Sequence, residues 1–129
     1  MNGVGRTLTA AVIAGVIAAA CGSDSDSTGT TAPAAPEPLR IGALDIDFDA
    51  DGYTAPAGDI EMVLVQEGML PHSLVVERVD GTDVSGRLDV AIDDVDDTTT
   101  FSLDAGEYVL YCDVVGHRAA GMEATLTIS

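Results

Sequence analysis

From residue 39 onward, apolar and polar positions alternate in short runs separated by turn residues. In residues 41–53, Leu44, Ile46 and Phe48 alternate with aspartates before the turn sequence ADG. A period of two predicts a half-buried β-strand. Six further short runs follow, none with sustained apolar spacing of 3.6 residues, at 59–68, 72–79, 86–92, 98–103, 106–112 and 122–129. Seven to eight short strands with frequent turns predict an all-β, Greek-key β-sandwich.

The run at residues 106–112 places its side chains on two faces. Strand geometry puts Tyr108, Leu110 and Cys112 on one face and Val109 and Tyr111 on the other. The preceding DAG turn favours a tyrosine corner, in which the tyrosine hydroxyl bonds backward to the backbone. Cys112 is therefore expected at the end of a core strand, facing inward. Taken alone, such a cysteine is first interpreted as a small hydrophobic core residue.

The first 20 residues have the pattern of an export signal. Arg6 precedes an apolar run of 13 residues at 8–20, which is followed by Cys21 and a polar tract. A helix needs about 20 apolar residues to cross a bilayer, so we expect no retained transmembrane span here. The sequence IAAAC resembles a bacterial lipobox, which implies that Cys21 becomes the lipidated N-terminus of the mature chain. The alternatives are conventional cleavage with a free Cys21, or a disulfide between Cys21 and Cys112.

A low-complexity tract of 17 residues, 22–38, separates Cys21 from the first predicted strand. It holds almost no large apolar residues, so it is expected to act as a flexible tether. The predicted organisation is a signal peptide at 1–20, a lipidated Cys21 with its linker at 21–38, and one folded domain at 39–129. This predicts an exported, lipid-anchored protein at the outer face of the cytoplasmic membrane, in the periplasm or at the cell surface.

The charge of the chain is strongly acidic. All 22 acidic residues and four of the five basic ones lie after Cys21, which gives the mature chain a formal charge of −18. Nucleic acid is excluded as a partner because its binding depends on Lys and Arg neutralising phosphates. The acidic residues form either a solvated surface or a docking surface for a basic partner.

Three residue types that are rare in this chain occur together near its end. Cys112, His117 and Met122 have the spacing C-x4-H-x4-M, with Gly116 and Gly121 bending the loop. The only other histidine, His72, opens the run at 72–79. A thiolate and two imidazoles with a weak thioether make a type 1 blue copper site. Zinc is the rival metal, but structural zinc sites favour four Cys or His ligands.

Either histidine or the methionine alone would be read as an ordinary core or surface residue. In this order, spacing and strand context, residues 39–129 resemble the cupredoxins, the blue copper proteins of the plastocyanin, halocyanin, auracyanin and rusticyanin kind. The resemblance rests on the sequences YTAPAGDIEMVLVQEG, PHSLVVE, LDAGEYVLYC and GHRAAGMEATLTIS. It implies one copper ion bound by His72 and His117 through Nδ1, by Cys112 through sulfur, and axially by Met122.

The resemblance also implies roles for neighbours of the ligands. The Pro71 carbonyl would lie near the opposite axial side, and Ser73 stands where many members have an asparagine that braces the cysteine loop. Electrons would pass through the edge of His117, and a second route from Cys112 would use Tyr111, which is otherwise an ordinary strand aromatic. An apolar rim is expected around His117, formed by Met69, Leu70, Pro71, Ala119 and Ala120.

These features predict an electron carrier rather than an enzyme, because the pattern leaves no open coordination position and no spare histidine. Its expected partners are redox proteins, such as a cytochrome or a membrane electron-transfer complex, and the protein itself is expected to be a monomer. An exported module that buffers or delivers copper is the alternative function. A copper-free interaction domain is a third.

Overall fold

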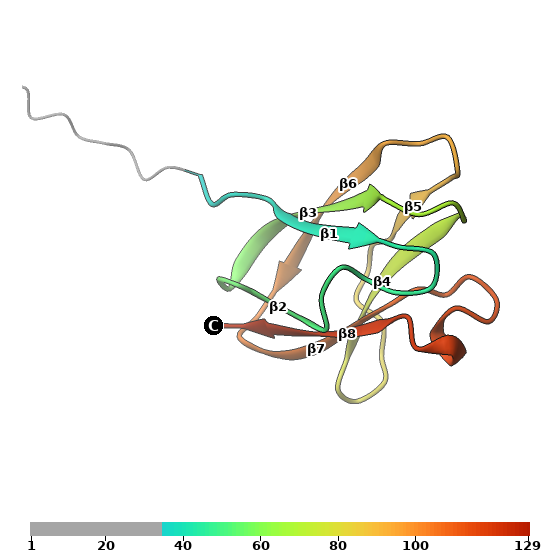
Figure 1. The fold of residues 1–129 in the computed structure, drawn as a ribbon. Coiled ribbons are helices and arrows are strands. Elements are labelled where there is room, and N and C mark those ends of the chain that lie inside the picture. The colour runs from blue at the N-terminus through green and yellow to red at the C-terminus, as the bar shows by residue number, and fades with distance from the viewer. Residues whose placement is uncertain (1–34) are drawn as a thin grey trace, which may run out of the picture. The chain divides into compact units, whose positions relative to one another are not determined.

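The computed structural model describes residues 35–129, which fold into two β-sheets (Figure 1). The predicted signal peptide, Cys21 and nearly all of the linker lie outside the described residues. Eight strands and one short 3-10 helix follow in chain order: β1 Leu39–Ala43, β2 Gly52–Ala55, β3 Gly58–Gln66, β4 His72–Arg78, β5 Leu88–Val90, β6 Asp96–Leu103, β7 Gly106–Tyr111, η1 Arg118–Ala120 and β8 Glu123–Ile128. Within residues 35–129, no helix is long and apolar enough to cross a membrane.

The chain passes repeatedly between the two sheets. One sheet has the order β1-β3-β6 and the other the order β2-β8-β7-β4-β5. β1 pairs with β3 and β2 pairs with β8 in parallel, whereas the other pairings are antiparallel. Strands far apart in sequence are therefore neighbours, as in a Greek key. The prediction of an all-β Greek-key sandwich with seven to eight strands is confirmed.

The core lies between the sheets and follows the alternation of the strands. In β8, Ala124, Leu126 and Ile128 are buried while the residues between them are exposed. From the other strands, Ile41, Met62, Leu64, Leu74, Val76, Phe101 and Leu110 are also buried. Each such side chain stabilises the fold by about 1.5–3 kcal/mol relative to an exposed position. The core thus fixes the strand ends from which the candidate site is built.

The predicted strand at Leu44, Ile46 and Phe48 is wrong. Residues 44–51 form bends, and Leu44 and Ile46 are 38% and 50% exposed; only Phe48 is buried. Aspartates in this segment bond to backbone amides inside and outside it. The amide of Phe48 donates to Asp47 Oδ1 at 2.9 Å, and Asp49 and Asp45 accept from the amides of Gly42 and Met69 at 2.8 and 2.7 Å. Such local side-chain bonds compete with strand pairing.

The tyrosine corner is present. Tyr108 is buried in β7, and its hydroxyl donates to the carbonyl of Asp104 at 2.9 Å across the turn between β6 and β7. This bond fixes the start of β7, whose alternation then carries Leu110 and Cys112 into the core. The predicted inward orientation of Cys112 is confirmed.

Candidate metal centre

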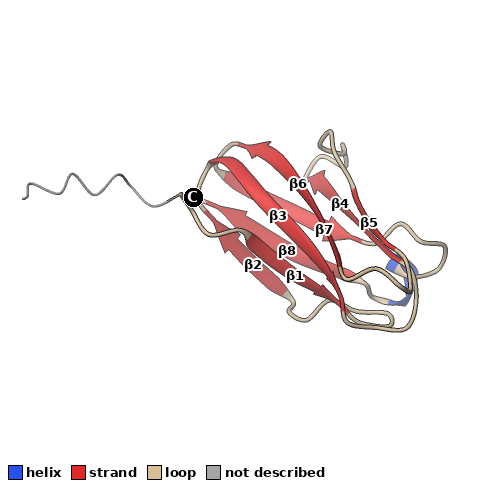
Figure 2. Cartoon of the chain, turned by 90° about the horizontal axis from the view of Figure 1, so that it is seen from above, coloured by secondary structure: helices blue, strands red, loops and turns tan. Residues whose placement is uncertain are grey.

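The four predicted ligands come from two strand ends and one loop at the same end of the sandwich. His72 is the first residue of β4, and Cys112 directly follows the last residue of β7. β4 and β7 are hydrogen-bonded neighbours, with Val75 opposite Tyr111. His117 lies in the loop between β7 and β8, directly before η1, and Met122 directly precedes β8. Figure 2 shows this loop and η1 beyond the strand ends.

The structure brings His72, Cys112 and His117 together. One ligand atom from each side chain lies within 4.8 Å of the others. Cys112 Sγ and His117 Nδ1 are 3.6 Å apart, and the two imidazole centroids are 5.2 Å apart. A first-row metal bound to sulfur at about 2.3 Å and to nitrogen at about 2.0 Å would place those atoms roughly 3.5–3.8 Å apart. The separation therefore fits two ligands of one metal ion.

His72 lacks the partners that a buried imidazole normally has. It is 2% exposed, and neither of its ring nitrogens hydrogen-bonds to any group within residues 35–129. Burial, reinforced by the nearby His117 ring, lowers the pKa of His72, so the neutral ring is favoured. Neutral imidazole is the form that binds metals. An unpartnered, neutral, buried histidine beside a cysteine fits a ligand better than a core residue.

Cys112 is fully buried and has a free thiol. The alternative of a disulfide with Cys21 concerns a residue outside the described part of the chain. The backbone amide of Ser73 donates to its sulfur at 3.4 Å. Hydrogen bonding and the apolar surroundings of a cysteine sulfur are the features that tune the potential of a thiolate copper site. The protein therefore supplies both around this residue.

Backbone hydrogen bonds close the loop that carries the other ligands. The Cys112 amide donates to the Met122 carbonyl at 3.2 Å, and the Met122 amide donates to the His117 carbonyl at 3.1 Å. Gly116 and Gly121 have φ angles of 88° and 113°, which side chains other than glycine rarely adopt. Met122 is fully buried within this closed loop. Its axial role stays a prediction.

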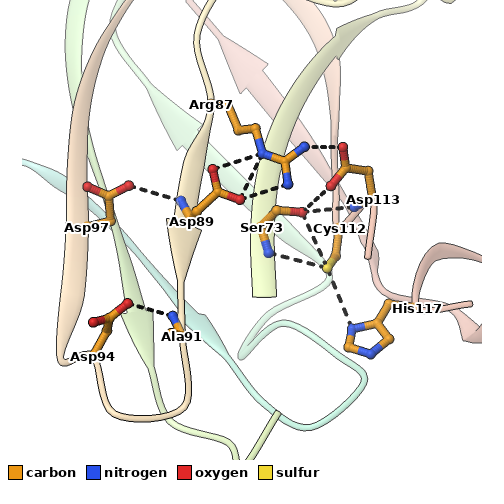
Figure 3. A network of polar contacts seen from close by, with 9 residues as sticks. All are labelled: Ser73, Arg87, Asp89, Ala91, Asp94, Asp97, Cys112, Asp113 and His117. Carbon is orange, nitrogen blue, oxygen red and sulfur yellow. Dashed lines mark hydrogen bonds and ion pairs between the residues drawn. The ribbon is translucent and has the colours of Figure 1, made fainter. Parts of the chain in front are cut away.

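The hydroxyl of Ser73 bridges the cysteine loop, as Figure 3 shows. It donates to Asp113 Oδ1 at 2.6 Å and accepts from the Asp113 amide at 3.0 Å. The other Asp113 oxygen forms an ion pair with Arg87, which also pairs with Asp89. Sequence reasoning identified Ser73 but missed its partner Asp113, and it also missed Arg87, the partner of Asp113. Neither has a local motif, because the contacts join residues 26 and 40 positions apart.

The residues of the predicted rim precede His72 or follow His117 in sequence, and their exposure can be compared with that of the ligands. The His117 ring is itself partly exposed, whereas His72 is buried. Met69, Leu70, Pro71, Ala119 and Ala120 are all exposed. Pro71 lies directly before the buried His72, as predicted, and its carbonyl role remains untested. His117 is thus the ligand with access to the surface.

Tyr111 points away from the core, next to Cys112. Its hydroxyl donates to Asp83 Oδ1 at 3.1 Å, and Arg118 lies over its ring. Burial and the bond to Asp83 raise the pKa of Tyr111, so its phenol stays protonated at neutral pH. A surface pocket beside the ring is lined by Cys112, Val114 and Ala119, among others.

Comparison with known proteins places the fold. No family model matches the chain, and no curated protein does so. Among solved structures, reduced auracyanin from Roseiflexus castenholzii aligns with a TM-score of 0.61 and 18% identity, covering 70% of this chain and 95% of its own. The chain has a cupredoxin fold. Auracyanin A, a "blue" copper protein from Chloroflexus aurantiacus, also gives a TM-score of 0.61 at 18% identity, covering 74% of this chain and 100% of its own. Auracyanin B gives 0.59 at 18% identity, covering 74% of this chain and 91% of its own.

The donor set fits one type 1 copper ion. Within this cupredoxin fold, two imidazoles and a cysteine sulfur converge, and one ring nitrogen of the unpartnered His72 lies within 4.8 Å of the other two ligand atoms. Two histidines with one cysteine are the in-plane ligands of blue copper sites. A closed structural zinc site would need a fourth strong ligand, and the cluster of His, Cys, Asp and Glu side chains found in residues 35–129 has three members.

Proposed function

We propose that this protein is a type 1 blue copper electron carrier that transfers one electron at a time. The observation that carries the proposal is the buried convergence of His72, Cys112 and His117, with both nitrogens of His72 left without hydrogen bonds in the described domain. A bound copper ion supplies the one-electron change between Cu(I) and Cu(II). The relation in fold to auracyanin A, a "blue" copper protein, supports the same proposal.

The residues of this chain hold the site and limit its access. His72 and Cys112 are fixed at the ends of paired strands, so their positions need not change with oxidation state. Burial of His72, Cys112 and Met122 excludes water from most of the site. His117 is partly exposed among apolar residues, which suits electron passage through its ring edge to a docked partner. This arrangement favours outer-sphere transfer to a docked partner.

We further propose that the domain is exported and held at the outer face of the cytoplasmic membrane by a lipid on Cys21. The export pattern at residues 1–20 and the IAAAC sequence support this. The partners are redox proteins, such as a cytochrome or a membrane electron-transfer complex, and the carrier acts as a monomer.

The test is a titration of the metal-free protein with Cu(II). One equivalent should bind and give an intense visible thiolate-to-copper band, and the copper should stay bound through repeated cycles of ascorbate reduction and ferricyanide oxidation. Copper that binds but is lost on reduction would favour the buffering or delivery module instead. A protein that binds no copper and gains no colour would be a copper-free interaction domain, and the proposal would fail.

A further inference from the structure

One hydroxyl hydrogen beside the metal centre has two acceptors within reach. Ser73 is fully buried, so its hydroxyl must find its partner inside the protein. Its oxygen lies 2.6 Å from Asp113 Oδ1 and 3.6 Å from Cys112 Sγ. A serine hydroxyl has a single hydrogen to donate. The hydrogen can serve the carboxylate or the sulfur, and not both with good geometry.

The geometry decides in favour of the carboxylate. A distance of 2.6 Å is typical of a hydroxyl donating to an ionised oxygen, and such charge-assisted bonds are about twice as strong as neutral ones. The Asp113 amide donates back to the Ser73 oxygen at 3.0 Å and helps to fix its orientation. As a result, the Ser73 backbone amide at 3.4 Å is the main donor to the Cys112 sulfur, and the contact of the Ser73 hydroxyl with that sulfur at 3.6 Å is the weaker of the two contacts that the hydroxyl makes (Figure 3).

Arg87 holds the carboxylate in the position that captures this hydrogen. It pairs with Asp113 Oδ2, which leaves Oδ1 for Ser73, and it is itself held by Asp89 at 2.7 Å (Figure 3). The Arg87 and Asp113 side chains are 45% and 36% exposed, so their pairing adds little to stability. The consequence of the pair is positional: it orients one carboxylate oxygen toward the buried hydroxyl.

We infer that Asp113, oriented by Arg87, is a positioning residue that keeps the Ser73 hydroxyl hydrogen away from the Cys112 sulfur and so lowers the reduction potential of the site. This inference rests on the proposed copper function. A second donor on the sulfur would draw electron density from the thiolate and weaken its donation to Cu(II), which favours the reduced state. Asp113 competes for the same hydrogen and so weakens that second bond.

A double-mutant cycle separates the hydroxyl from the charge of Asp113. Asp113→Ala removes the carboxylate and frees the hydrogen to turn to the sulfur, but it also removes a negative charge, and both changes raise the potential. In a Ser73→Ala background there is no hydroxyl, so Asp113→Ala reports the charge alone. Reduction potentials are measured by voltammetry on the copper-loaded protein for all four combinations.

We expect Asp113→Ala to raise the potential more when Ser73 is present. A hydrogen bond to a charged group changes an equilibrium by about tenfold. For a one-electron couple that difference is about 59 mV. Asp93→Ala is the control for charge, because it removes an exposed carboxylate that lies outside the Arg87 cluster and does not touch Ser73. Its shift should be the same in both backgrounds.

Equal shifts of Asp113→Ala in the two backgrounds would overturn the inference, while an intact blue band in those same proteins would leave the proposed function standing. A wild type that binds no copper would instead remove the proposed function.

A second measurement needs no variant and no copper. In the metal-free protein, NMR should show a deuterium isotope shift at the Asp113 carboxyl carbon when the Ser73 hydroxyl is exchanged. The absence of that shift would also overturn the inference.

Discussion

The guanidinium carbon of Arg118 lies 3.8 Å from the centroid of the Tyr111 ring. Arg118 also forms a bidentate pair with Glu77, at 2.9 and 3.0 Å, and its Nε donates to Glu123 at 2.8 Å. Tyr111 directly precedes Cys112 in sequence. One face of its ring is covered by the Arg118 guanidinium, whose charge is balanced by Glu77 and Glu123. A partner using a Tyr111 route would meet this covered face, whereas the rim around His117 is open.

The Glu77–Arg118 pair predicts a loss of stability in acid. Hydrogen bonding to Arg118 holds the pKa of Glu77 below its usual value of 4.5. A carboxyl with a lowered folded-state pKa contributes stability that is complete above pH 4.5 and is lost as the pH falls through the folded value. Glu77→Gln should reduce the difference in unfolding free energy between pH 6 and pH 3, measured by urea denaturation of the metal-free protein.

The control for that experiment is Glu61→Gln, the same change of charge at an exposed position of β3. It should leave the acid dependence close to that of the wild type. If the unfolding free energy of Glu77→Gln depends on pH just as that of the wild type does, the Glu77–Arg118 pair contributes nothing to stability in solution.

Replacing the cysteine ligand should remove the colour. Cys112→Ser exchanges the thiolate for a hydroxyl, so the thiolate-to-copper band of the Cu(II) protein should disappear, as measured by visible absorption at one equivalent of copper. Cys21→Ser is the matched control, because it changes the only other cysteine in the chain and should keep the band. A persistent band in Cys112→Ser would refute the site.

Replacing the predicted axial ligand should raise the reduction potential. A thioether is a weak donor that stabilises Cu(II) more than Cu(I), so Met122→Leu should retain copper but favour the reduced state. The control is Met62→Leu, since Met62 is also fully buried but lies in β3. Each change conserves volume and should cost less than about 1.5 kcal/mol. A potential that is unchanged or lower in Met122→Leu would show that this residue is not axial.

The lipid anchor predicts a difference in fractionation. In a bacterial host, the wild-type protein should sediment with membranes and partition into detergent, because a lipidated Cys21 would carry acyl chains. Cys21→Ser should lose this behaviour but keep the copper site, as judged by its visible spectrum. Wild-type protein recovered in the soluble exported fraction, with an unmodified N-terminus in mass spectrometry, would argue for conventional cleavage.

The strong acidity predicts how the transfer rate responds to salt. The Debye length falls from about 30 Å at 0.01 M to about 10 Å at 0.1 M, so a rate steered by the acidic surface would fall steeply over that range. We expect only a small change in stopped-flow rates with the physiological partner. The reason is that the loop between β7 and β8, which carries His117, has only one acidic and one basic residue, Asp113 and Arg118. Each of them is paired with residues outside the loop.

Charge reversals in residues 93–97, which run from the turn after β5 into the start of β6, give a local probe of the alternative. The side chains of Asp94 and Asp97 accept hydrogen bonds from the backbone amides of Ala91 and Asp89, at 2.6 and 2.9 Å. Reversing the charge of either aspartate would therefore disturb the local backbone. Asp93 and Asp96 are exposed and are the better sites for Asp→Lys changes. A rate that drops more than tenfold with salt, and loses that dependence in Asp93→Lys with Asp96→Lys, would identify this turn as the docking site.

The fold and the grouping of Cys112 with both histidines could be predicted because each has a local signal. Alternation and turn residues marked most strands, and the spacing of Cys112, His117 and Met122 identified the loop. The error at Leu44 and Ile46 arose because alternation does not show whether an aspartate beside it will capture a backbone amide. The ion pair between Arg87 and Asp113 could not be predicted for another reason. The two residues come together only when β5 and β7 pair with β4 in the folded domain.

The position of β1 within the sandwich bears on which surfaces of the domain serve attachment and which serve electron exchange. β1 begins at Leu39 at the end of the sandwich that also holds the C-terminus, and η1 lies at the other end (Figure 2). The chain thus enters the sandwich at one end, while the partly exposed His117 lies in the loop at the opposite end. Attachment of the domain through its N-terminal side and the proposed electron exchange at His117 would therefore use different ends of the sandwich and need not compete for the same surface.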